Sequence, residues 1–217
     1  MSLSLEEGAL LVRMARSAVS SYLATGTKPS VPESLPDRLR EKRPVFVTIR
    51  KLVTDSEGVR RWALRGCLGY VTPLLPLAEA TVNAAIAAAT RDPRFSPLTA
   101  QELPHVIFEV TVLSELEPVE VEDPRDYPRE VRVGVHGLVV EKGLARAVLL
   151  PQIAVEYEWD ERTFLSQACV KAGLPPDAWE LGDLKVYRFT AQIFAEIEPQ
   201  GEVIERQLYV EEAPGSC

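Results

Sequence analysis

The segment Val45–Ile49, Val-Phe-Val-Thr-Ile, and the segment Trp62–Tyr70 that follows it decide the fold of this chain. The first is rich in β-branched and aromatic side chains, and the second begins and ends with an aromatic residue; such side chains favour strands. A polar turn around Asp55 to Gly58 separates them. Two such runs joined by a polar turn predict an antiparallel pair of strands.

Helices are predicted on either side of this pair. Ser4 and Glu7 have capping-box spacing, and apolar residues then recur at helical intervals. After the pair, a helix is expected from about Leu77 to Thr90, and its many alanines allow close packing on a sheet. Asp92-Pro93 ends it, because proline disfavours a helical conformation of the residue before it. Val106–Leu113 is predicted to be a further strand.

A second lobe is expected after an acidic, proline-containing crossing between Leu116 and Tyr127. Strands are predicted at Val131–Val135 and Leu138–Val140, and a helix after the N-cap candidate Asp160. Leu184–Ile197 alternates in polarity and predicts one long final strand that returns to the first lobe.

The predicted fold class is therefore α+β, in two lobes. Each lobe is expected to be a mostly antiparallel sheet packed with helices, with a cleft between the lobes. Residues 1–115 plus 184–217 are assigned to the larger lobe and residues 116–183 to the smaller one.

Composition limits the partners that the protein is expected to bind and the cell compartment in which it is expected to lie. The net charge of −8 repels phosphate backbones, so we expect no nucleic-acid partner. No run of 18 apolar residues occurs, and the N-terminus lacks the pattern of a signal peptide, so we expect no membrane span and a cytoplasmic protein. The three cysteines, Cys67, Cys169 and Cys217, form no C-x-x-C pair. We therefore predict reduced thiols and no metal site.

The segment Leu64–Gly69, Leu-Arg-Gly-Cys-Leu-Gly, holds the first candidates for chemistry. In a regular strand, Arg65 and Cys67 share one face beside Gly66 and Gly69. A nearby arginine favours the nucleophilic thiolate, and strand glycines mark close approach of a ligand or of another backbone. The alternative is a buried apolar thiol with Arg65 paired to an acidic group, and residue types alone favour it.

His136, Asp92 and Arg94 are further candidates. His136 could act as a general base for Cys67 if the lobes meet at a cleft, although a histidine between two glycines more often caps a turn. Asp92 and Arg94 could hold an anionic ligand, although an Asp-Pro-Arg turn is usually a structural lock. Neither a phosphate-binding loop nor a dinucleotide fingerprint is present, so the sequence indicates no nucleotide site of these two kinds, and any cofactor is unknown.

Several segments in order resemble hallmark segments of the AMMECR family. They are Phe46–Ile49, Leu64–Gly69, Asp92–Leu98, Glu109–Leu113, Gly137–Val140, Leu149–Gln152 and Lys171–Leu174. The resemblance covers roughly residues 9 to 195. It implies an α+β fold in two lobes with a cleft lined by the Arg-Gly-Cys segment. It also implies a radical-SAM protein and a Memo-type protein as possible partners, because similar microbial proteins are often encoded beside these two.

Two functional hypotheses follow. The first is an enzyme or carrier in a modification pathway that acts through Cys67, with Arg65 lowering the pKa of the thiol or binding an anionic substrate group. The second is a binding or adaptor module that holds a small anionic ligand or a partner peptide in the cleft, with Arg65 and Arg94 as anchors. Substrate and oligomeric state are not predicted.

Overall fold

The computed structural model describes residues 2–54, 56 and 58–208. The chain is α+β and divides into two compact units. Unit 1 runs up to Leu113 and includes Gln192–Arg206, and unit 2 contains Ser114–Ala191. The sequence-based division placed residue 184 onward in the larger lobe, whereas the chain rejoins unit 1 at Gln192.

Unit 1 is built on a five-stranded sheet in the order β2-β1-β3-β8-β9. These strands are β1 (Val45–Thr54), β2 (Arg60–Tyr70), β3 (Val106–Leu113), β8 (Ala191–Glu196) and β9 (Val203–Glu205). β1 pairs antiparallel with both β2 and β3, so the predicted hairpin is confirmed. The turn expected around Asp55 to Gly58 includes residues 55 and 57, which lie outside the described residues.

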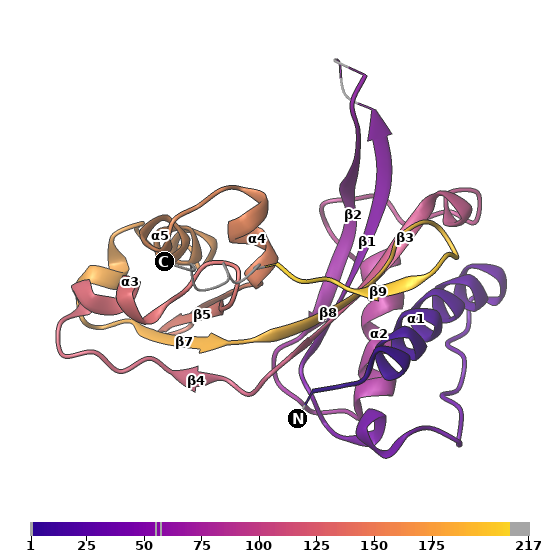
Figure 1. Ribbon diagram of the computed structural model, residues 1–217, viewed down its shortest axis with the longest axis horizontal. Coiled ribbons are helices and arrows are strands. Elements are labelled where there is room, and N and C mark those ends of the chain that lie inside the picture. Colours follow the sequence, from indigo (N-terminus) through magenta and orange to yellow (C-terminus); the bar gives the residue numbers. More distant parts are fainter. Residues whose placement is uncertain (1, 55, 57, 209–217) are drawn as a thin grey trace, which may run out of the picture. The chain divides into compact units, whose positions relative to one another are not determined.

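Two helices, α1 (Leu5–Thr25) and α2 (Leu77–Thr90), pack side by side on one face of this sheet (Figure 1). The capping box of Ser4 and Glu7 opens α1 as predicted, and Gly26 closes the helix in the left-handed conformation. Alternate residues of β1 face the helices and join the core of unit 1. The opposite face of the sheet carries buried polar side chains, including Thr48, Glu109 and Thr111.

Short 3₁₀ segments connect these elements. They are η1 (Asp37–Arg40) and η2 (Leu103–His105) in unit 1, and η3 (Pro124–Asp126) and η4 (Ala178–Glu180) in unit 2.

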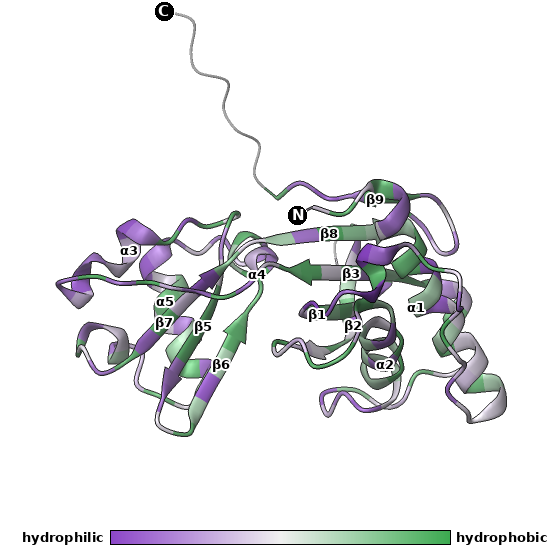
Figure 2. Cartoon of the chain, turned by 90° about the horizontal axis from the view of Figure 1, so that it is seen from below, coloured by the Kyte–Doolittle hydropathy of each residue, from purple (hydrophilic) through white to green (hydrophobic). Residues whose placement is uncertain are grey.

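Unit 2 has its own antiparallel sheet, in the order β4-β7-β5-β6. Its strands are β4 (Glu117–Pro118), β5 (Gly137–Lys142), β6 (Ala145–Leu149) and β7 (Lys185–Phe189), and its helices are α3 (Tyr127–Glu130), α4 (Pro151–Glu156) and α5 (Glu161–Lys171). Figure 2 shows that β5 is more apolar than β7. A separate core of buried side chains, with Trp179 and Phe164 among its largest, stabilises this unit.

Two strand predictions in unit 2 are wrong. Val131–Val135 forms a turn, in which Gly134 has a positive φ of 80° and His136 donates its amide to the carbonyl of Arg132. The single strand expected at Leu184–Ile197 is two strands, β7 and β8, which belong to different sheets. A period-two pattern cannot reveal such a break, because the alternation continues through Thr190.

Candidate functional site

A β-bulge interrupts β2 at the Arg-Gly-Cys segment. Gly66 pairs with Ile49 and Leu64 pairs with Arg50, so Arg65 has no partner in β1. The extra residue interrupts the regular alternation from which Arg65 and Cys67 were assigned to one face, so that assignment stays a prediction. Bulges are common beside functional sites, where they re-aim a side chain.

Beyond the bulge, the register decides which side each residue of β2 faces. Leu68 lies opposite Val47 and packs against the core under the helices. Cys67 lies opposite Thr48, and directly opposed residues share one face of an antiparallel sheet. The thiol therefore lies on the face of the sheet that does not contact the helices.

Arg65 is held by an acidic partner and by backbone carbonyls. Its Nε and Nη2 donate to the two oxygens of Glu102, each at 3.0 Å, and its Nη1 donates to the carbonyl of Ser96 at 2.9 Å. The hydrogen bond from Arg65 lowers the pKa of Glu102 to about 2. This arrangement matches the structural alternative for Arg65, since all three nitrogens are engaged away from Cys67.

The backbone of Cys67 is bonded to the Asp92–Arg94 ion pair. Its amide donates to Oδ2 of Asp92 at 2.8 Å, and Arg94 Nη2 donates to its carbonyl at 3.4 Å. Asp92 also accepts from Nε and Nη2 of Arg94 at 2.9 and 2.7 Å, and the Arg94 bond holds its pKa at about 2. Because β2 is an edge strand, these groups satisfy backbone atoms that no neighbouring strand reaches.

The thiol of Cys67 is partly buried and receives a side-chain hydrogen bond. Thr48 Oγ1 donates to Cys67 Sγ at 3.3 Å, and Thr48 itself is only 3% exposed. Next in this row, on β3, lies Glu109, which is 1% exposed and forms ion pairs with Arg50 at 3.8 Å and with Arg206. A thiol, a hydroxyl and a carboxylate thus lie in one row across three strands.

Phe95 lies between Arg65 and Arg94 and contacts both guanidinium groups. The Arg65 guanidinium carbon lies 5.9 Å from the centre of the Phe95 ring, and that of Arg94 lies 5.6 Å from it. We call Thr48, Arg65, Cys67, Asp92, Arg94, Phe95 and Glu102 the thiol cluster. The structure thus brings together four of the predicted site residues.

The two glycines of the motif are approached by this chain's own backbone. A Cβ on Gly66 would lie 2.2 Å from the carbonyl oxygen of Ala88 in α2, and one on Gly69 would lie 2.3 Å from that of Val45. Close helix and strand packing explains both glycines. Their binding of a ligand stays a prediction.

His136 lies in unit 2, where it stabilises a turn. Its Nδ1 accepts from the Arg132 amide at 3.0 Å, so in the neutral imidazole the proton lies on Nε2 and neither nitrogen has a free lone pair. Burial and the nearby Arg188 lower the pKa of His136, which favours this neutral form. Its role as a base for Cys67 stays a prediction, and that role would require the turn bond to break.

Sequence reasoning missed Thr48, Glu102 and Phe95. A usable signal existed for Glu102, because Thr99 and Glu102 have capping-box spacing and exchange that pair of bonds at 3.2 and 3.3 Å. Thr48 could be identified only from the strand register. Among the described residues, no group of three or more His, Cys, Asp or Glu side chains could hold a metal ion, and no helix could span a membrane.

Comparisons with known proteins agree over nearly the whole chain. Residues 12–194 match the AMMECR1 family model. A protein of Thermofilum pendens is 57% identical over 96% of this chain and 98% of its own length, and one of Methanocaldococcus jannaschii is 47% identical over 95% and 98%. The crystal structure of uncharacterized protein PH0010 from Pyrococcus horikoshii has a TM-score of 0.87 at 46% identity, and the match covers 93% of this chain and 97% of that one.

Proposed function

This chain belongs to the AMMECR1 family, and from that premise we propose that its functional group is the thiol of Cys67. In this proposal the protein is the thiol-bearing component of a modification pathway. The proposed partners are a radical-SAM protein and a Memo-type protein, because the genes of similar proteins often lie beside genes for these two.

The observation that carries the proposal is the support given to Cys67. Its amide and its carbonyl are both bonded to the Asp92–Arg94 pair, while the side chain keeps partial exposure. A buried structural cysteine needs no such support, since packing alone holds a small apolar side chain. A reactive group, in contrast, gains from being held in one geometry.

Thr48 has a chemical role in this proposal. A hydroxyl that donates to sulfur stabilises the charged thiolate more than the neutral thiol, and the thiolate is the nucleophile. Asp92 and Arg94 act as positioning residues, and Arg65 with Glu102 fixes the loop that follows α2. Glu109 lies two strands from Cys67, about 10 Å away, so it does not serve as a direct base.

The experiment is the pH dependence of Cys67 alkylation in a folded variant with Cys169→Ala and Cys217→Ser. Cys169 is buried in unit 2, and burial raises the pKa of its thiol, so alanine fits that site better than serine. Cys217 lies outside the described residues. We expect an apparent pKa below the ordinary value of about 8.5. If Cys67 is alkylated only after the protein unfolds, the proposal is overturned.

A binding module is the second candidate, favoured by the exposure of Arg94. Its side chain is 54% exposed, whereas that of Arg65 is 11% exposed and bonded on every nitrogen. Arg94 is therefore the better anchor for an anionic ligand or a partner peptide. Affinity capture from native extract should recover a partner that an Arg94→Ala variant loses. Equal recovery by both proteins would count against this site.

A further inference from the structure

The outer part of the β1–β2 hairpin extends beyond the rest of its sheet. β3 pairs with β1 only over Val45–Lys51, so the last rungs, from Leu52 opposite Trp62 to Thr54 opposite Arg60, join two strands alone (Figure 1). A two-stranded ribbon is marginally stable by itself. Its open sides are therefore surfaces that a ligand could cover.

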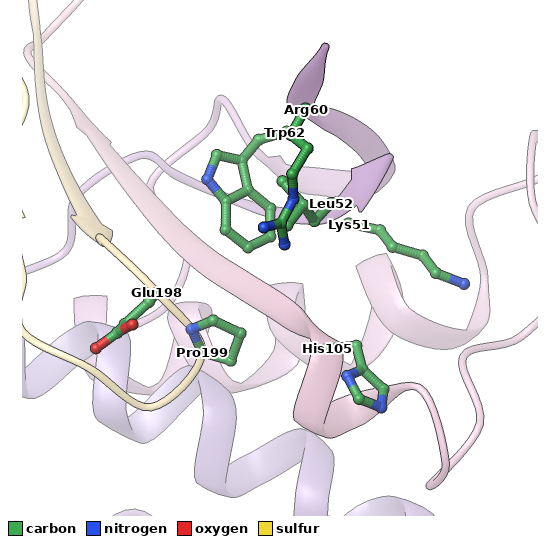
Figure 3. A pocket seen from close by; sticks show the side chains of 7 residues that line it. All are labelled: Lys51, Leu52, Arg60, Trp62, His105, Glu198 and Pro199. Atoms are coloured by element: carbon green, nitrogen blue, oxygen red, sulfur yellow. The ribbon is translucent and has the colours of Figure 1, made fainter. Parts of the chain in front are cut away.

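A pocket of ≈ 740 Å³ lies at the base of this ribbon, within unit 1. We call it the hairpin pocket; it is lined by Lys51, Leu52, Arg60, Trp62, His105, Glu198 and Pro199. The lining comes from the hairpin, from η2 and from the turn between β8 and β9 (Figure 3). The volume is in the range of pockets that bind small organic molecules, roughly 300–1,000 Å³.

The charge of the hairpin pocket is opposite to that of the chain. The whole sequence has 32 acidic residues and 24 lysines and arginines, yet the pocket lining includes Lys51 and Arg60 and the single carboxylate of Glu198. The Lys51 amine lies 3.4 Å from Glu102. Glu102 is already bonded twice by Arg65, so Lys51 still contributes positive charge.

Arg60 is the cation best placed to bind an added anion. It is exposed, and among the residues that the structure describes no ion pair or hydrogen bond engages its guanidinium. Guanidinium groups bind carboxylates and phosphates through two parallel hydrogen bonds.

The lining also has an apolar part, which includes one planar ring. The half-buried indole of Trp62 lies on the same side of the ribbon as Arg60, two residues away, and Leu52 and Pro199 add apolar surface. Figure 3 shows the indole and the Arg60 side chain extending from the hairpin, with Pro199 and His105 on other elements. A nucleobase stacked on such a ring typically contributes about 1–3 kcal/mol.

We propose that the hairpin pocket binds a small anion that carries a planar ring, of the size of a nucleoside monophosphate. Trp62 stacks on the ring, and Arg60 binds the anionic group. The site is separate from the thiol, because Trp62 and Cys67 are five residues apart on β2, about 15 Å along the strand. The inference therefore does not depend on the reactivity of Cys67.

The test is calorimetric titration of the full chain with AMP, adenosine and inorganic phosphate at low salt. We expect saturable binding of AMP at submillimolar concentration, and at least about tenfold weaker binding of adenosine, which lacks the anion, and of phosphate, which lacks the ring. Arg60→Ala and Trp62→Leu should each weaken AMP binding about tenfold or more. Circular dichroism checks that both variants are folded.

Arg61→Ala is the matched control, because Arg61 is exposed, adjacent in sequence and on the opposite side of the ribbon. It should bind AMP like the unmodified chain. An equal loss in Arg60→Ala and Arg61→Ala would mean non-specific charge attraction and would overturn the proposal. Absence of AMP binding below about 1 mM would overturn it as well. Cys67 alkylation would be unaffected by either result, so the two proposals fail separately.

Discussion

The carboxylate of Asp92 accepts a hydrogen bond from the backbone amide of Cys67 at 2.8 Å, although 25 residues separate them. Asp92 lies two residues after the end of α2, and Cys67 lies in an edge strand. The bond therefore connects the helix layer to the strand that carries the thiol. It also places a negative charge beside the backbone of Cys67, where Arg94 balances it.

The first prediction concerns Asp92→Asn, which keeps the shape of the side chain and removes its charge. The variant should lose on the order of 1–2 kcal/mol of unfolding free energy, because a buried acceptor that serves both Cys67 and Arg94 becomes neutral. Urea denaturation measures this loss.

The sequence offers a matched control in a second Asp-Pro-Arg segment, Asp123–Arg125. Asp123 bonds Arg125 as Asp92 bonds Arg94, yet both side chains of this pair are exposed, and among the described residues no distant backbone amide donates to Asp123. Solvent screens such a pair, so Asp123→Asn should have a much smaller effect. Equal losses in the two variants would show that the Asp92–Cys67 bond contributes little.

The second prediction is a pH dependence of stability. Hydrogen bonding to Arg94 lowers the pKa of Asp92 to about 2 in the folded chain, from an ordinary value near 3.8. Its contribution to stability is therefore complete above about pH 4 and is lost as the pH falls toward 2. The difference in unfolding free energy between the unmodified chain and Asp92→Asn should shrink over that interval. A constant difference from pH 6 to 2 would contradict the assignment.

The third prediction concerns Gly66→Ala. The added Cβ would meet the Ala88 carbonyl at 2.2 Å, a backbone atom that cannot rotate away, so α2 or β2 must shift. We expect a loss of about 3 kcal/mol in thermal or urea unfolding. Gly26→Ala is the control, because nothing lies within 4 Å of its Cβ position and only its φ of +71° is strained, at about 1 kcal/mol. Similar losses of unfolding free energy in the two variants would mean that α2 can shift at little energetic cost.

The fourth prediction concerns Thr48→Val, which removes the donor to Cys67 Sγ and keeps a β-branched shape. The apparent pKa of alkylation should rise in this variant, because the thiolate loses a hydrogen bond that favours it. Thr111→Val is a suitable control, since Thr111 is buried on the neighbouring strand β3, opposite Phe46. An unchanged pH profile in Thr48→Val would remove Thr48 from the proposed mechanism.

Much of the fold could be predicted because its signals are local. The capping box of Ser4 and Glu7, the alanine-rich helix α2 and the β-branched strand β1 are each specified within one stretch of chain. The wrong strand predictions arose where the alternation of apolar and polar residues was weak, or where it continued past the true end of a strand. The turn at residues 131–135 and the break at Thr190 both lie in alternating sequence that also fits a strand.

The candidate site was predicted in part. The Asp92–Arg94 lock was recognisable, because both groups lie in one short turn. The partners of Arg65 were not, since Glu102 lies 37 residues further along the chain. Likewise, the row that includes Cys67, Thr48 and Glu109 depends on the register of three strands.

By itself, the sequence determined the helices, most strands and the α+β class of this protein, because hydrophobic period and capping residues act over a few positions of the chain. Only the tertiary structure decided that Arg65 is a bulge residue held by Glu102 and that Cys67 lies opposite Thr48. It also decided that Trp62 and Arg60 line a pocket with residues from β8–β9. The physical reason is that a one-residue slip between strands exchanges the two faces of a sheet, and only long-range pairing sets that register.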